Sequence, residues 1–140
     1  MEEEITARIE KKIEQVEEYL DEVDSVIPDN LKEYEKSNTI KRACERYFQL
    51  IAESIIDLAF FVIIYKKLEQ PMSEDSVFDV LFNGKVISAS LRDNLKDAKS
   101  MRNFIIHRYG EIDDAKVYYS LSEELEKHAR EFIVKVREIV

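Results

Sequence analysis

The chain has 140 residues, enough for one domain with a substantial core, and we expect a single domain over residues 1–140. Hydrophobic residues make up 45% and charged residues 36%, which excludes a disordered chain, and the presence of only two glycines and two prolines favours helices. The net charge of −9 argues against general coating of nucleic acid, and the single cysteine excludes an internal disulfide.

The first half of the chain carries two long helical patterns. Over residues 2–26, apolar residues recur at intervals of three and four, which predicts an amphipathic helix. Residues 31–36 can form a short helical turn. Ser37 or Asn38 can cap a second long helix. Its second half, residues 58–65, is apolar on every side, so we expect it to be buried in the centre of the fold.

A short third helix is predicted after this long one. Ser73 or Asp75 can cap it, and it should end near Phe82. The dipeptide Asn83-Gly84 follows. Gly84 is expected to adopt the left-handed conformation that commonly ends a helix.

Two more long helices complete the pattern. One should begin near Ser88 or Ser90 and end at Gly110, and the other should begin at Asp113 or Asp114. No internal repeat or linker divides the chain. The sequence therefore predicts an all-α, antiparallel up-and-down bundle of four main helices plus one or two short helices.

Two features of the sequence indicate the cellular compartment of the protein. The first residues, Met1-Glu2-Glu3-Glu4, lack the basic region and apolar core of a secretory leader. The longest uninterrupted apolar run, residues 58–65, is too short to span a bilayer. Together with the single cysteine, these features predict a cytoplasmic protein with no membrane segment.

Residues 101–109 are the most unusual stretch of the chain. They lie in a region, residues 85–109, with six basic and two acidic residues, so a positive patch that could receive phosphate is expected there. Arg102 falls on the apolar seam of the helix predicted from Ser88 or Ser90 to Gly110, where an aliphatic residue would be usual. Either Arg102 lines a cleft, or it pairs with a carboxylate such as Glu53 or Asp57.

Arg102 and His107 are five residues apart, which is roughly 140° around a straight helix. A joint site therefore requires a distorted helix end or a second copy of the helix in a homodimer. Asn103 and His107 share one face. His107 could also be a half-buried residue at the helix end with no role, and Tyr109 a seam aromatic.

The sequence patterns of other kinds of functional site are weak or missing. The polar residues Arg46, Glu53 and Asp57 share one stripe of the second long helix and either line the same cleft, together with Arg108, or face solvent. Neither histidine has the Glu-x-x-His spacing of a di-iron bundle, and two glycines cannot form a glycine-rich phosphate loop. Glu124 and His128 are predicted to lie on the solvated surface of the last helix. We therefore predict no metal and no cofactor.

The motif Arg102-Asn103-x-x-x-His107-x-Tyr109 resembles the Arg-x4-His-x-Tyr motif of the HepT-like toxins, a branch of the HEPN superfamily. Residues 42–59 look like the second helix of that family, and the run at 109–113 is also similar. The resemblance covers most of the chain from about residue 30 onward.

This resemblance implies a metal-independent endoribonuclease toxin that acts as a homodimer, with two motifs meeting in one cleft. His107 would be the general acid or base, Arg102 the phosphate clamp, and Asn103 would orient the phosphate or His107. It also implies a cognate minimal nucleotidyltransferase antitoxin of the MntA type, which would transfer AMP to Tyr109.

Two other hypotheses stay open. The chain could be a non-catalytic HEPN module that binds a nucleotide or serves as an adaptor for a nucleotidyltransferase, a reading that the acidity mildly favours. It could also be a structural bundle in which Arg102 forms only a core ion pair.

Overall fold

The computed structural model describes residues 2–107 and 112–140, and every regular element in these ranges is helical. In chain order the elements are α1 (Glu2–Val26), α2 (Leu31–Lys36), α3 (Asn38–Lys66), η1 (Glu74–Ser76), α4 (Val77–Asn83), α5 (Ala89–His107), α6 (Asp114–Tyr119), η2 (Ser120–Leu125) and α7 (Glu126–Ile139). The all-α prediction is confirmed. The described ranges contain three short elements before α5, namely α2, η1 and α4, where one or two were expected.

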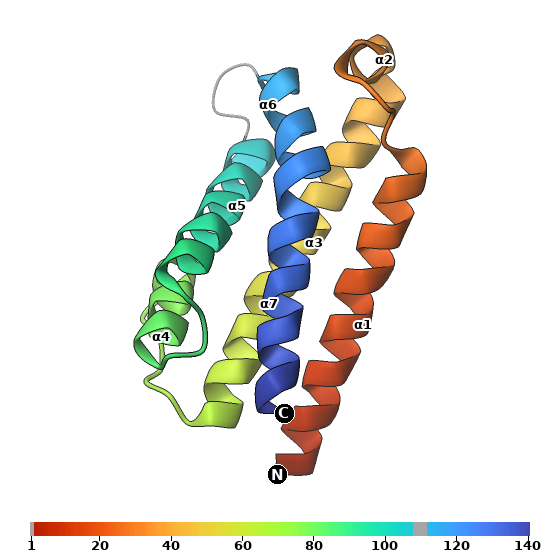
Figure 1. The fold of residues 1–140 in the computed structure, drawn as a ribbon. Coiled ribbons are helices and arrows are strands. Elements are labelled where there is room, and N and C mark those ends of the chain that lie inside the picture. Colours follow the sequence, from red (N-terminus) through yellow and green to blue (C-terminus); the bar gives the residue numbers. More distant parts are fainter. Residues whose placement is uncertain (1, 108–111) are drawn as a thin grey trace.

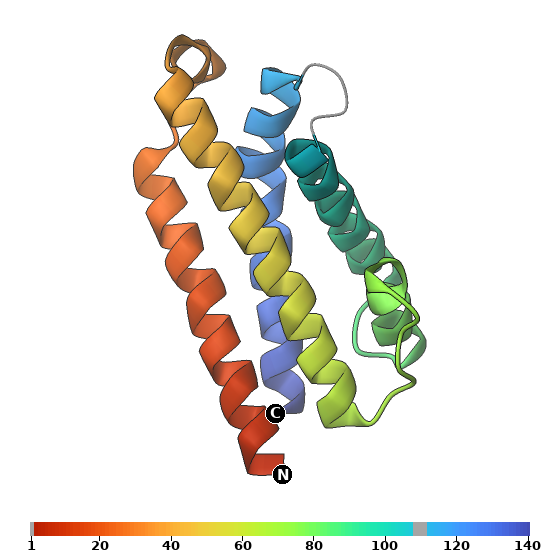
Figure 2. The same ribbon diagram turned by 180° about the vertical axis from the view of Figure 1, so that it is seen from behind.

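The long helices run alternately up and down as an antiparallel bundle (Figure 1). α1 packs on α3, α3 on α5, α5 on α7, and α7 on α1, so the four surround a common core. α6, η2 and α7 follow one another without a break and form one long helical rod. Both ends of the chain lie at one end of the bundle, and the C-terminal end of α5 lies at the other end, where α2 and α6 also lie (Figures 1 and 2).

Polar side chains begin several helices as the sequence predicts. Ser37, Ser88 and Asp113 each accept a hydrogen bond from the backbone N–H three residues further on, at 3.2, 3.1 and 3.2 Å. Each bond satisfies one of the backbone donors that a helix leaves unpaired at its start. These caps fix where α3, α5 and α6 begin.

The prediction for the ends of α4 is wrong in two respects. Neither Ser73 nor Asp75 caps it with a side chain, because η1 precedes α4 and Asp75 instead pairs with a lysine of α5. Gly84 is not left-handed (φ −80°), and Lys85 takes that conformation instead (φ 63°). A Cβ on Gly84 would lie 2.7 Å from Leu68 Cδ1, so a larger residue there would have to displace the Leu68 side chain.

The expectation that residues 58–65 are buried on every side is also wrong. Leu58, Val62 and Ile63 are buried, but Phe60 and Phe61 are only partly covered and Ile64 is half exposed. α3 is long and apolar enough, by composition, to cross a membrane, and 56% of its apolar window is buried inside the bundle, as in a core helix of a soluble protein. An apolar strip of α3 is thus left on the surface of the single chain.

Candidate functional site

Arg102 lies on the buried side of α5, and its side chain is only 8% exposed. Its Nη1 donates to Glu53 Oε2 on α3 at 3.4 Å, and its Nη2 donates to Glu74 Oε1 in η1 at 2.6 Å. Its Nε is buried and has no hydrogen-bond acceptor among the residues that the structure describes. The expected pairing of Arg102 with a carboxylate is confirmed for Glu53, whereas Asp57 pairs with Lys12 at 3.4 Å.

Glu74 is the partner of Arg102 that the sequence did not reveal. It lies 28 positions before Arg102, in the short segment between α3 and α4, where helical periodicity gives no information. The side chains of Glu53 and Glu74 are 36% and 50% exposed, so both carboxylates reach water. The side chain of Arg102 is therefore buried and held by the core, whereas the carboxylates of its two partners lie at the surface.

Arg102 is the last member of a line of basic side chains along α5. We call this line the cation row, and it consists of Arg92, Lys96, Lys99 and Arg102. Lys99 donates to Asp75, and this hydrogen bond together with the lysine charge lowers the pKa of the Asp75 carboxyl. Lys96 Nζ lies 3.1 Å from both carboxylate oxygens of Asp79. Carboxylates of the same chain therefore pair with much of the positive charge that the sequence predicts for this stretch.

His107 and Asn103 lie on a different face of α5 from Arg102. His107 is exposed at the last residue of the helix, and Asn103 is half-buried one turn before it. α5 stays α-helical from Ala89 to His107, so the side chains of Arg102 and His107 leave the helix roughly 140° apart. The described residues do not show the distorted helix end that would bring the two together within one chain.

The remaining predicted site residues are divided between three places. Glu53 lies beside Arg102 and also accepts a hydrogen bond from Gln49 Nε2 at 3.3 Å. Arg46 is exposed on α3, and Asp57 is turned toward α1. Arg108 and Tyr109 lie outside the described residues. No three His, Cys, Asp or Glu side chains in the described ranges lie close enough together to hold a metal ion.

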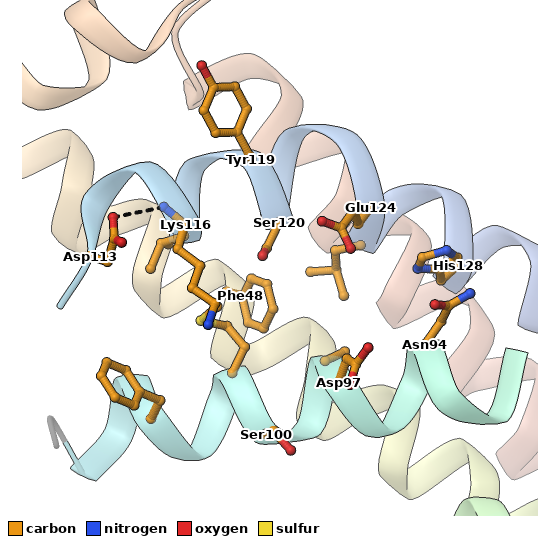
Figure 3. A pocket seen from close by; sticks show the side chains of 15 residues that line it. Phe48, Asn94, Asp97, Ser100, Asp113, Lys116, Tyr119, Ser120, Glu124 and His128 are labelled. Atoms are coloured by element: carbon orange, nitrogen blue, oxygen red, sulfur yellow. Dashed lines mark hydrogen bonds between the residues drawn. The ribbon is translucent and has the colours of Figure 1, made fainter. Parts of the chain in front are cut away.

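A cavity of about 690 Å³ lies between α5 and the rod formed by α6, η2 and α7 (Figure 3). Asp97 and Phe104 line it from α5, and both lie roughly 140–160° around that helix from Arg102. Arg102, Asn103 and His107 are not among its lining residues. The cavity is therefore separate from the predicted site.

The lining of the cavity is mixed in charge. Lys116 reaches from α6 toward α5, while His128 and Asn94 point toward each other at the other end (Figure 3). Glu124, from the π-helical segment η2, also lines it. Glu124 is exposed, as the prediction of solvated surface expects, whereas His128 is half-buried at the cavity. The sequence pattern of α7 carried no sign of the cavity, because it depends on how α5 approaches η2.

With the geometry established, three comparisons with known proteins are informative. A model of the family described as "Ribonuclease HepT-like" matches residues 9–136. The chain is 24% identical over 120 residues to the tRNA nuclease HepT of Aphanizomenon flos-aquae, across 86% of this chain and 82% of that protein. It is 27% identical over 94 residues to the mRNA nuclease HepT of Shewanella oneidensis, across 67% and 71% of the two chains.

The fold is also found among solved structures. A structure of a tri-AMPylated Shewanella oneidensis HEPN toxin in complex with its MNT antitoxin superimposes with a TM-score of 0.86 and 25% sequence identity. The match covers 93% of this chain and 96% of that chain. The bundle and the order of its helices are therefore those of that toxin.

Proposed function

Because the chain belongs to the ribonuclease HepT-like family of the HEPN superfamily, we propose that it is an endoribonuclease that cleaves RNA without a metal ion. It would act in the cytoplasm as the toxin of a toxin–antitoxin pair. The observation that carries this proposal is the environment of Arg102: a guanidinium held by the core, whose Nε has no acceptor in the described ranges and whose two partners are reached by water.

The proposed chemistry uses two groups on α5. The 2′-hydroxyl of the RNA attacks the adjacent phosphorus, its proton passes to a base, and the leaving 5′-oxygen receives a proton as the P–O bond breaks. An imidazole can move protons near neutral pH, and we assign that step to His107. The guanidinium fork of Arg102 matches phosphate oxygens and would stabilise the negative charge that develops on them. Asn103, which shares a face with His107, would orient the phosphate or the imidazole.

The divergence of Arg102 and His107 around α5 supports a site shared by two chains. In a homodimer, Arg102 of one protomer could face the same phosphate as His107 of its partner. One apolar side chain beside the proposed site is available for such an interface, because Ile106 on α5, the neighbour of His107, is exposed. Ile64 on α3 is also exposed, but it lies close to the end of α3, near the opposite end of the bundle.

The test of this function is RNA cleavage in the presence of a chelator. Purified protein, free of any antitoxin and kept in EDTA, is expected to cut tRNA or mRNA at a rate within about twofold of the rate with Mg²⁺, because the proposed proton transfer and charge stabilisation use side chains alone. Cleavage products would be separated by denaturing electrophoresis. A rate that falls to background in EDTA and returns with Mg²⁺ would contradict the metal-independent mechanism.

We further propose that a partner nucleotidyltransferase silences the chain by transferring AMP to Tyr109. Co-expression with a cognate MNT-type nucleotidyltransferase should increase the intact mass by one or more AMP residues. The Tyr109→Phe variant should lose at least the first of these additions, because the phenylalanine has no hydroxyl to accept the group. The added phosphate brings negative charge to the motif and would compete with RNA. An unchanged mass spectrum from an active co-expressed partner would count against this regulation.

The alternative function, a non-catalytic module, is favoured by the acidity of the chain and by one feature of its structure. The cation row is largely paired with the chain's own carboxylates, which weakens it as an open binding surface for RNA. This alternative predicts tight binding to the nucleotidyltransferase with no cleavage at any protein concentration, so the chelator assay separates the two.

A further inference from the structure

The acidic segment before and within α4 covers the cation row of α5. We call this segment the acidic strap, and it comprises residues 73–79 with the carboxylates Glu74, Asp75 and Asp79. Its pairs run in antiparallel order along α5: Glu74 with Arg102 at 2.6 Å, then Asp75 with Lys99, then Asp79 with Lys96 at 3.1 Å and with Arg92 at 3.9 Å. Every member of the row therefore has a strap carboxylate as a neighbour.

The spacing of the cation row suits a chain of regularly placed anions. Its members follow one another at intervals of four, three and three residues, which correspond to steps of about 4.5–6 Å along a helix. All lie within roughly 120° of the helix circumference, with Arg102 at the end nearest His107. A strand of RNA whose scissile phosphate is held at Arg102 could place neighbouring phosphates along the remaining members.

The burial of the two partners in each pair is unequal, and this inequality indicates which partner can leave. The side chains of Arg102 and Lys99 are only 8% and 10% exposed, whereas those of Glu74 and Asp75 are 50% and 83% exposed. Releasing an exposed carboxylate into water costs little, because it is already largely hydrated. The cations stay in place, since their stems are packed in the bundle.

The two halves of the acidic strap are held differently. α4 is anchored by the buried side chains of Val77, Phe78 and Leu81. η1 has no buried residue, and the segment that leads to it includes the almost fully exposed Met72. Glu74 and Asp75 can therefore move away from α5 without disturbing the core, while Asp79 stays with α4.

We propose that the Arg102 end of the cation row, Lys99 and Arg102, is a binding track for successive phosphates of single-stranded RNA, and that Glu74 and Asp75 of the acidic strap occupy this track in the free protein as an internal competitor. The inference rests on the proposed function for the identity of the ligand. Carboxylate and phosphate oxygens satisfy the same donors, and the guanidinium fork accepts either in paired hydrogen bonds. RNA binding replaces Glu74 and Asp75 with phosphate oxygens, and these two carboxylates lower the affinity for RNA.

The test measures binding rather than cleavage. A fluorescent 2′-O-methyl oligoribonucleotide has phosphates but no free 2′-hydroxyl, so it binds without being cut. The double variant Glu74→Gln with Asp75→Asn is expected to bind it about three- to tenfold more tightly than the wild type at low salt, since two weak ion pairs no longer compete. The single variant Asp75→Asn should show a smaller gain in the same direction.

The matched control is the double variant Glu33→Gln with Glu138→Gln. It removes the same two charges from exposed side chains on α2 and α7, whose partners are Lys36 and Lys135. An equal gain in this control would reduce the effect to net charge and overturn the proposal, as would unchanged or weaker binding by the strap variants. If the strap variants bind RNA more tightly but the protein never cleaves RNA, the binding track is supported and the proposed nuclease function is refuted. If the protein cleaves RNA but the strap variants gain no affinity, the nuclease function is supported and the binding track is refuted.

Discussion

Replacing His107 with alanine is expected to lower the rate of RNA cleavage by about 10²–10⁴-fold, the usual contribution of a positioned acid or base. The thermal unfolding midpoint should stay the same within error, because His107 is exposed at the end of α5 and fills no part of the core. The two measurements are a cleavage time course and a melting curve on the same preparation.

The other histidine of the chain is the matched control for this experiment. His128 lines the cavity on the far side of α5 and plays no part in the proposed chemistry. His128→Ala should therefore cleave RNA at nearly the wild-type rate. If His107→Ala retained full activity in a preparation free of contaminating nuclease, or if both variants lost activity equally, the assignment of His107 would fail.

Replacing Arg102 with alanine is expected to lower cleavage by about 10²–10³-fold, because the developing charge on the phosphate loses its fixed cation. Stability should fall by no more than about 1–2 kcal/mol, since Glu53 and Glu74 are partly exposed and can be hydrated once their partner is gone. Arg102→Lys keeps the charge but loses the planar fork, so it should recover only part of the activity.

Mixing the two inactive variants tests whether the site spans two chains. If Arg102 of one protomer acts with His107 of its partner, refolding equal amounts of Arg102→Ala and His107→Ala together should restore about a quarter of the wild-type activity, because half of the dimers are mixed and each has one intact site of two. Each variant refolded alone is the control. A mixture that stays inactive although size measurements show mixed dimers would refute the shared site.

For the Arg102→Ala variant alone, a strong loss of stability with unchanged cleavage would favour a purely structural arginine.

Much of the fold was predictable because local signals dominate in this chain. The periodic apolar residues and the caps at Ser37, Ser88 and Asp113 act within one turn of helix, so the sequence alone narrows each cap to one of two nearby residues. Arg102 also stood out, since a charged residue interrupts an apolar seam. What could be predicted of the candidate site was thus its residues and their divergence around α5.

The parts that could not be predicted depend on contacts between distant segments. Glu74 reaches Arg102 only because η1 folds back over α5, and no periodicity describes a residue in such a connection. The left-handed conformation falls on Lys85 rather than on Gly84, although only glycine adopts it without a steric cost. The exposure of Ile64 could not be inferred either, because an apolar run carries no information about which side the neighbouring helices leave open.

The π-helical segment η2 accommodates one additional residue in the rod formed by α6, η2 and α7. The buried residues around it recur at intervals of four, from Val117 through Leu121 and Leu125 to Ala129. On a continuous α-helix each such interval would rotate the buried side by about 40°, and three would carry it about 120° away from the core. The wider turn of η2 absorbs this rotation. With one residue fewer at the exposed position Ser122, the intervals would become four, three and four, which an ordinary α-helix accommodates. The rod formed by α6, η2 and α7 thus contains one residue more than the packing of its core requires. This is the arrangement expected when a single residue is inserted into an α-helix.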